Sequence, residues 1–202
     1  MSSDGLLMGL AVVMVVVAVI GMGFTYISVS NVKQSLTGFA TDTATANLTV
    51  TATAAINFTT DNINFGTGYV SEGFPYGVLD SENQKANVSG FTSNNVGFVL
   101  ENIGNVNVTL SINTAQNAAG FLGGTSPEYK FKVNDAESGS CAKAGTLALG
   151  TYTAAGTSAN VCADFLASDA TDTLRVDIYL KLPSDSKTGA LGDTMTATAT
   201  AL

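Results

Sequence analysis

Cys141 and Cys162 are the only cysteines of the chain, and oxidation would join them in one disulfide bond. Paired cysteines in a chain that also carries a long apolar leading segment are typical of exported proteins. We therefore predict a disulfide between Cys141 and Cys162, with two buried free thiols as the alternative. Closing a loop of this length stabilises a domain by roughly 3 kcal/mol.

Groups suited to catalysis are scarce in this sequence. The chain has no histidine, so it lacks the usual proton shuttle near neutral pH and the commonest metal ligand. It contains neither a G-x-S-x-G turn nor a phosphate-binding glycine loop. Acidic residues cluster at 80–82 and 169–172 and could hold Ca²⁺ through oxygen ligands, but such clusters more often only solvate a loop. We expect no enzymatic activity, no cofactor and no bound metal.

Four Asn-x-Ser/Thr sequons are candidate acceptors for N-linked glycans. Chance alone gives about this number in a chain so rich in Asn, Ser and Thr, so each remains a candidate. Glycans at several of them would place the domain outside the cell. The four asparagines are Asn47, Asn57, Asn87 and Asn107.

The charge of the chain argues against nucleic acid as a partner. Only 12% of the residues are charged, the net charge is −8, and the few Lys and Arg residues are scattered. A nucleic-acid-binding surface needs clustered basic residues to neutralise phosphates.

Residues 38–202 are predicted to form an all-β head domain. Several stretches alternate apolar with small or polar residues, as strands with one buried face do. The stretch "FVLENIGNVNVTLSI" is predicted to be a hairpin that turns across residues 102–105. Several short strands without helical segments between them indicate an antiparallel β-sandwich of the immunoglobulin-like class. The alternating stretches are 43–58, 105–112, 128–133, 174–182 and 193–202.

Residues 1–37 are predicted to form one long hydrophobic α-helix. The run from Leu6 to Ile27 contains no charge and is long enough to cross a hydrocarbon layer of roughly 30 Å. Apolar residues continue at nearly helical spacing to Leu36, and Gly38 would end the helix. The predicted fold is therefore a long N-terminal hydrophobic helix followed by an all-β sandwich head.

The charges that flank this segment predict processing of the chain. A membrane segment with its following domain outside should carry Lys or Arg on its N-terminal side. Here that side carries Asp4, and the first basic residue is Lys33. Removal of a basic leader on the cytoplasmic side, before Met1, would resolve the conflict.

A hydrophobic segment that stays in the mature chain after such a cut resembles the type IV pilin superfamily, and more specifically archaeal type IV pilins and archaellins. The resemblance covers the N-terminal segment. It implies that the helices of many copies pack as the core of a filament drawn out of the membrane, with the heads on its surface. Bacterial pilins favour a Glu where this chain has Asp4. The residues expected to pack in the filament core are Asp4, Gly5, Leu6, Leu7, Gly9, Leu10, Val13, Val16, Val17, Ile20, Phe24 and Ile27.

A second resemblance is carried by "FVLENIGNVNVTL", residues 98–110. This stretch is similar to biofilm-matrix fibre proteins of the camelysin type, and it implies subunits that polymerise by donating a strand to a neighbour. In that family the hydrophobic leader is removed.

The sequence thus predicts a structural subunit of an extracellular, cell-surface filament that serves adhesion or attachment. Its expected partners are copies of itself and, before assembly, the membrane; the filament would carry glycans if the sequons are used. A membrane-anchored monomeric adhesin is the first alternative. A subunit of the archaellum, the archaeal swimming filament, is the second.

Overall fold

The computed structural model describes residues 45, 48–92 and 95–202. The chain divides into two units, Met1–Thr49 and Val50–Leu202. Of the described residues, 42% lie in strands and 3% are helical. The predicted domain boundary after residue 37 lies outside the described residues.

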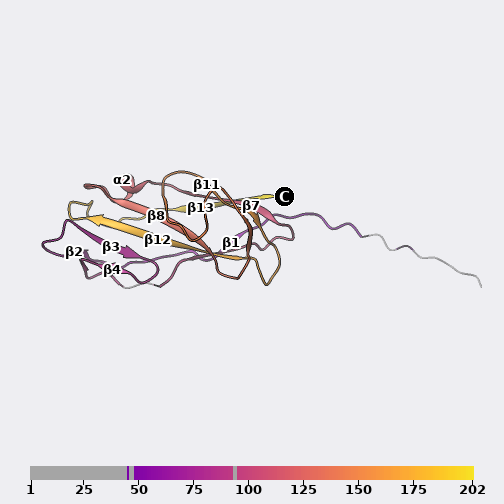
Figure 1. Cartoon of the computed structure of the whole chain (residues 1–202), viewed down its shortest axis with the longest axis horizontal. Helices are drawn as coiled ribbons and strands as arrows, with labels where there is room; N and C mark the ends of the chain where they lie inside the picture. Colours follow the sequence, from indigo (N-terminus) through magenta and orange to yellow (C-terminus); the bar gives the residue numbers. More distant parts are fainter. Residues whose placement is uncertain (1–44, 46–47, 93–94) are drawn as a thin grey trace, which may run out of the picture. The chain divides into compact units, whose positions relative to one another are not determined.

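The larger of the two main sheets is built around strand β12, the longest described strand (Figure 1). β12 pairs antiparallel with β8 on one side, and with β6 and then β3 on the other. Beyond these neighbours lie β10, β1 and β4, respectively. The bounds of the seven strands are β1 Asn57–Thr60, β3 Tyr76–Asp80, β4 Lys85–Ala86, β6 Phe98–Glu101, β8 Glu128–Asp135, β10 Thr153–Ala154 and β12 Thr173–Pro183.

The smaller main sheet has the strand order β13-β7-β11-β9, and all its pairings are antiparallel. Two short strands, β2 (Tyr69–Val70) and β5 (Val88–Ser89), form a separate ribbon. One short helix, α2 (Ala118–Phe121), begins after the capping side chain of Asn117. The four strands of the smaller sheet are β7 Val108–Thr114, β9 Cys141–Ala144, β11 Ala159–Phe165 and β13 Met195–Ala201.

A single hydrophobic core joins the two main sheets. Strand alternation directs every second side chain of β7 and β12 toward it, because successive residues of a strand face opposite sides. Leu110 and Ile112 of β7, and Leu174 and Val176 of β12, are fully buried. Phe131 of β8 and Phe165 of β11 fill the same core from the two sheets.

A buried polar cluster holds the turn after β3 against β12. The Ser81 hydroxyl donates to Asp177 Oδ1 at 2.8 Å and accepts from the Ile178 amide at 2.9 Å. Arg175 Nε donates to the same Asp177 oxygen at 2.8 Å. Ser81 is 0% and Asp177 1% exposed, so these bonds replace water entirely.

Four of the predicted strands are confirmed as β7, β8, β12 and β13. The predicted strand over 43–58 is wrong for most of its described part, because only residues 57 and 58 belong to a strand there. The predicted hairpin is also wrong, since β6 lies in the larger sheet and β7 in the smaller one.

Asn102 explains why the segment between β6 and β7 crosses from one sheet to the other. Its side chain is buried, and its Nδ2 donates to the carbonyl oxygens of Val106, Phe165 and Leu166. Its Oδ1 accepts from the Gly104 amide at 3.1 Å. An asparagine that usually marks an exposed turn here anchors a crossover inside the domain.

The predicted fold class, a long hydrophobic helix followed by an immunoglobulin-like sandwich, is wrong. The described residues are nearly all β, and no helix among them is long and apolar enough to span a membrane. The predicted helix over 1–37 lies outside the described residues. The described sheets also depart from the seven or nine strands of immunoglobulin domains.

We predict that Ser81→Ala lowers the free energy of unfolding by about 2 kcal/mol, because it leaves the buried Ile178 amide and Asp177 Oδ1 without this partner. Urea denaturation of the purified protein measures the effect. Ser71→Ala is the matched control, since the Ser71 hydroxyl contacts only the Ser89 hydroxyl at a partly exposed site. Equal losses for the two variants would contradict the importance of the buried cluster.

Candidate functional site

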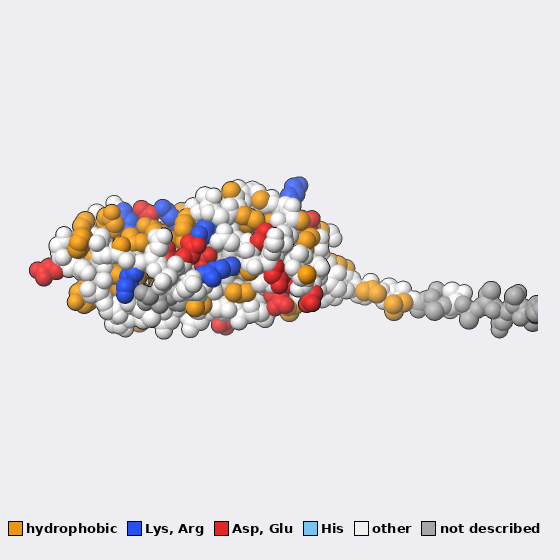
Figure 2. Space-filling view, turned by 60° about the horizontal axis from the view of Figure 1, so that its bottom comes forward, with side chains coloured by type: hydrophobic (Ala, Val, Ile, Leu, Met, Phe, Trp, Pro, Cys, Tyr) orange, Lys and Arg blue, Asp and Glu red, His pale blue; other side chains and the backbone are white. Residues whose placement is uncertain are grey.

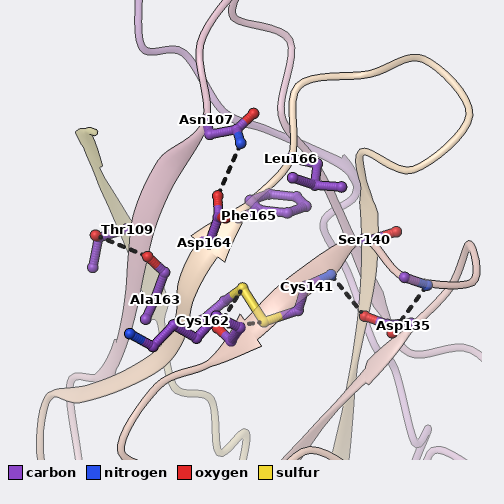
Figure 3. The surroundings of a disulfide bond; sticks show 12 residues. Asn107, Thr109, Asp135, Ser140, Cys141, Cys162, Ala163, Asp164, Phe165 and Leu166 are labelled. Carbon is purple, nitrogen blue, oxygen red and sulfur yellow. Dashed lines mark hydrogen bonds between the residues drawn. A yellow bond between two sulfur atoms is a disulfide. The ribbon is translucent and has the colours of Figure 1, made fainter.

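The disulfide that the sequence predicts is present between Cys141 of β9 and Cys162 of β11 (Figure 3). The two Cα atoms are 5.7 Å apart, and the Cys162 side chain is completely buried. β9 is the edge strand of its sheet, and three of its four residues are exposed. The bond therefore ties a weakly buried edge strand to the core of the domain.

The three described sequons lie in different surroundings. Asn57 is exposed at the start of β1, whereas Asn87 and Asn107 are half-buried. The Asn107 amide is engaged at both ends: Nδ2 donates to Asp164 Oδ1 at 2.9 Å, and Oδ1 accepts from the Ala167 amide. Asn47 lies outside the described residues.

The two acidic clusters serve local turns. Asp80 Oδ1 accepts from the backbone amides of Glu82 and Gln84, at 2.9 and 2.7 Å. Asp172 is buried, and its Oδ1 accepts from the Thr173 hydroxyl. Within the described ranges, no three acidic or cysteine side chains come together as a metal site would require.

The residues predicted to pack in a filament core all lie outside the described residues. They are Asp4, Gly5, Leu6, Leu7, Gly9, Leu10, Val13, Val16, Val17, Ile20, Phe24 and Ile27. Their predicted packing stays a prediction.

The outer face of the larger sheet carries charged and aromatic side chains that form ion pairs and hydrogen bonds with one another. Lys132 forms an ion pair with Glu82 at 2.6 Å, and the Tyr152 hydroxyl donates to the same carboxylate. The Lys132 hydrogen bond holds the pKa of the Glu82 carboxyl below its usual value. Figure 2 shows Lys and Arg side chains next to Asp and Glu side chains on one face of the domain. Most charges of this face thus lie next to an opposite charge, and Lys130 and Lys181 share the single carboxylate of Glu128.

An open cleft lies where the two main sheets part. It has a volume of about 160 Å³ and runs between the β1 end of the larger sheet and the start of β13. Phe58 and Phe98 form one wall, with their rings in edge-to-face contact and their centroids 5.9 Å apart. Met195 forms the opposite wall, beside Asp193 and Thr194.

The strands that flank this cleft are both sheet edges. β1 pairs only with β6, and β13 only with β7, among the described strands. The side chains that β13 turns inward are Met195, Ala197 and Ala199, which are partly buried and pack against the core. The unpaired edge amides and carbonyls of such a strand invite a further strand.

Asp193 places a carboxylate at this cleft. Both of its carboxylate oxygens are buried and lack a hydrogen-bond partner of normal geometry. The Tyr129 hydroxyl interacts with the carboxylate: burial, followed by the Asp193 charge, raises the pKa of Tyr129. Even with this neighbour, a carboxylate has more acceptor sites than one hydroxyl can fill.

The chain that enters the domain exposes apolar side chains at alternate positions. Leu48 is 88% and Val50 is 72% exposed. Further along, the Thr53 amide and carbonyl hydrogen-bond to Asn105, at 2.7 and 3.0 Å. A side chain at Gly104 would collide with the Thr53 carbonyl, so the missing Cβ lets the entering chain lie close against this loop. Asn105 Nδ2 also donates to the Thr51 carbonyl at 2.9 Å, so the chain is held to the domain from Thr51 onward.

Sequence reasoning found the disulfide and the sequons but missed the cleft. The alternation of Thr with Ala in "TMTATATAL" marks a strand with one inward face but does not indicate a cleft. Which strand becomes an edge depends on contacts far apart in the sequence.

We predict that the double variant Cys141→Ala/Cys162→Ala loses about 3 kcal/mol of unfolding free energy, because the unfolded chain regains the freedom of the closed loop. Urea denaturation of the oxidised protein and of the double variant measures the difference. A loss below about 1 kcal/mol would contradict a stabilising role for the bond.

We predict that Asp193→Asn raises the unfolding free energy by about 1 kcal/mol, because a neutral amide costs less to bury than a carboxylate that has only the Tyr129 hydroxyl as a partner. Asp61→Asn is the control, since Asp61 lines the same cleft but is exposed. Destabilisation by Asp193→Asn, measured by urea denaturation at pH 7, would mean that the carboxylate is well satisfied in the folded domain.

Comparison with known proteins gives no relative for this chain. No protein-family model, no curated protein and no solved structure matches it.

Proposed function

We propose that the protein is a structural subunit of an extracellular filament that serves adhesion or attachment to surfaces. In this proposal the β domain of one copy receives, in the cleft between β1 and β13, the apolar chain that enters the domain of the next copy. The observation that carries it is the pairing of an open cleft, which has apolar walls at Phe58, Phe98 and Met195, with an exposed, alternating segment around Leu48 and Val50.

A strand added at such a cleft would bind through its backbone hydrogen bonds and through the side chains that it buries. An added strand would pair its backbone with the free edge of β1 or β13, and turn alternate side chains toward the core. Leu48 and Val50 are the apolar members of that alternation in the described part of the segment. Burying each of them against Phe58, Phe98 and Met195 is worth about 1.5–3 kcal/mol.

The geometry of donor and acceptor favours an open polymer. The donating segment and the accepting cleft are different surfaces of the same chain, so contact between two copies leaves one cleft and one segment unused. Such head-to-tail contacts propagate into a filament unless their rotation closes a ring. Copies of the same chain are therefore the proposed partners.

Other features fit a role outside the cell. The disulfide suits an oxidising environment, and an apolar segment precedes the domain in the sequence. The resemblance to archaeal pilins and the resemblance to camelysin-type fibres both point to filaments. We propose that the chain passes through a membrane-associated stage before it assembles, and that it acts in structure rather than in catalysis.

A membrane-anchored monomeric adhesin is the second candidate. It is favoured by three exposed aromatic side chains near β2 and β3, Tyr69, Phe74 and Tyr76, with 65%, 47% and 41% of their surface accessible. Exposed aromatic rings are common in recognition surfaces. An anchored monomer would dissolve in mild detergent as single copies, whereas a filament would sediment.

We predict that Val50→Lys raises the protein concentration needed for assembly at least tenfold, because the polymer would lose the burial of Val50 and would have to accommodate a charge. Sedimentation of the full chain over a range of concentrations, followed by electron microscopy of the pellet, gives this value. Thr49→Lys is the matched control, because residue 49 alternates with Leu48 and Val50 and would point away from the core.

Equal effects of Val50→Lys and Thr49→Lys would refute the proposed contact. Wild-type protein that remains monomeric at all concentrations would refute the filament itself and favour the anchored adhesin.

A further inference from the structure

We propose that Asn57 carries an N-linked glycan and that Asn107, although it has the same sequon, stays unmodified. This inference is independent of the proposed filament, because it concerns which asparagine the folded domain leaves free. The substrate class is a lipid-linked oligosaccharide, the usual donor for such sequons.

Asn57 is the one exposed acceptor among the three described sequons. It is the first residue of β1, whose exposure alternates, so that Asn57 and Thr59 lie on the exposed face and Phe58 and Thr60 on the other. The Asn57 side chain therefore faces outward, while the Thr59 hydroxyl donates to the Val99 carbonyl at the long distance of 3.5 Å. A glycan there would project from the face of the sheet, away from the cleft that Phe58 lines.

Asn107 is held at both ends of its amide, and Figure 3 shows the bond to Asp164. Its Nδ2 and Oδ1 are hydrogen-bonded to Asp164 and to the Ala167 amide. The third residue of the sequon, Thr109, donates its hydroxyl to the Ala163 carbonyl at 3.3 Å. The amide cannot turn outward without breaking both of its bonds, and a sugar on Nδ2 would have to fit into a half-buried position between β7 and the end of β11.

Asn87 lies between these extremes. Its backbone is in the left-handed region, with φ 56°, and the residue is half-buried. The hydroxyl of Ser89, the third residue of its sequon, is 3.2 Å from the Ser71 hydroxyl, within hydrogen-bonding distance. Its sequon is thus more constrained than that of Asn57.

The chemical step consumes nothing from this chain except one amide proton. Asn57 Nδ2 forms a bond to the anomeric carbon of the first sugar, while the bond from that carbon to the phosphate oxygen of the lipid carrier breaks. The proton from Nδ2 is released, and the lipid phosphate leaves with the electron pair. No oxidant or reductant is needed.

Glycopeptide mapping by mass spectrometry of the protein purified from its native source tests the proposal. We expect a glycan mass on the peptide that contains Asn57 and an unmodified peptide around Asn107. An unmodified Asn57, or a glycan on Asn107, would overturn it.

A pair of variants separates an accessible acceptor from a structural amide. Asn57→Gln should remove the glycan and leave the urea midpoint of the unglycosylated recombinant protein unchanged. Asn107→Ala should lower that midpoint and leave the mapped glycan on Asn57 in place. A lower midpoint for Asn57→Gln, or an unchanged one for Asn107→Ala, would contradict the roles assigned to the two side chains.

Discussion

This domain depends on one constraint: the backbone amides and carbonyls at the edges of its two packed sheets need hydrogen-bond partners. Every interior strand pairs on both sides, but β1 and β13 each end a sheet on the side where the larger and smaller sheets part. Edge strands are normally blunted by charge, proline or a covering segment. Here Phe58, Phe98 and Met195 give the cleft an apolar part, and Asp61, Asp193 and Thr194 line the rest of it. The edges are therefore suited to an added strand.

The opposite edge of the smaller sheet is β9, and a disulfide bond holds this edge strand in place. β9 has little buried surface of its own, and the bond from Cys141 to Cys162 fixes it covalently to β11. The crossover between the sheets is fixed by the buried side chain of Asn102. One side of the domain is thus closed by covalent and polar contacts, while the side between β1 and β13 stays open. This asymmetry leaves the cleft between β1 and β13 open to a partner.

Local patterns predicted β7, β8, β12 and β13, because alternation along a strand follows directly from a core on one side, but they missed β3 and β11. Local patterns gave a wrong prediction where the same residue types occur both in exposed turns and in buried crossovers. Asn102 and Gly104 have the composition of an exposed turn, and only the carbonyls they meet in space make them a crossover. The disulfide was predictable by counting cysteines. The cleft was not, because it depends on Phe58 and Met195 meeting across 137 residues of sequence.

The most direct test of strand addition is electron cryo-microscopy of the assembled full-length protein. We predict an extended strand from a neighbouring copy between β1 and β13, with Leu48 or Val50 of that copy against Phe58 and Met195. A filament whose subunits touch elsewhere and leave this cleft open would contradict the account.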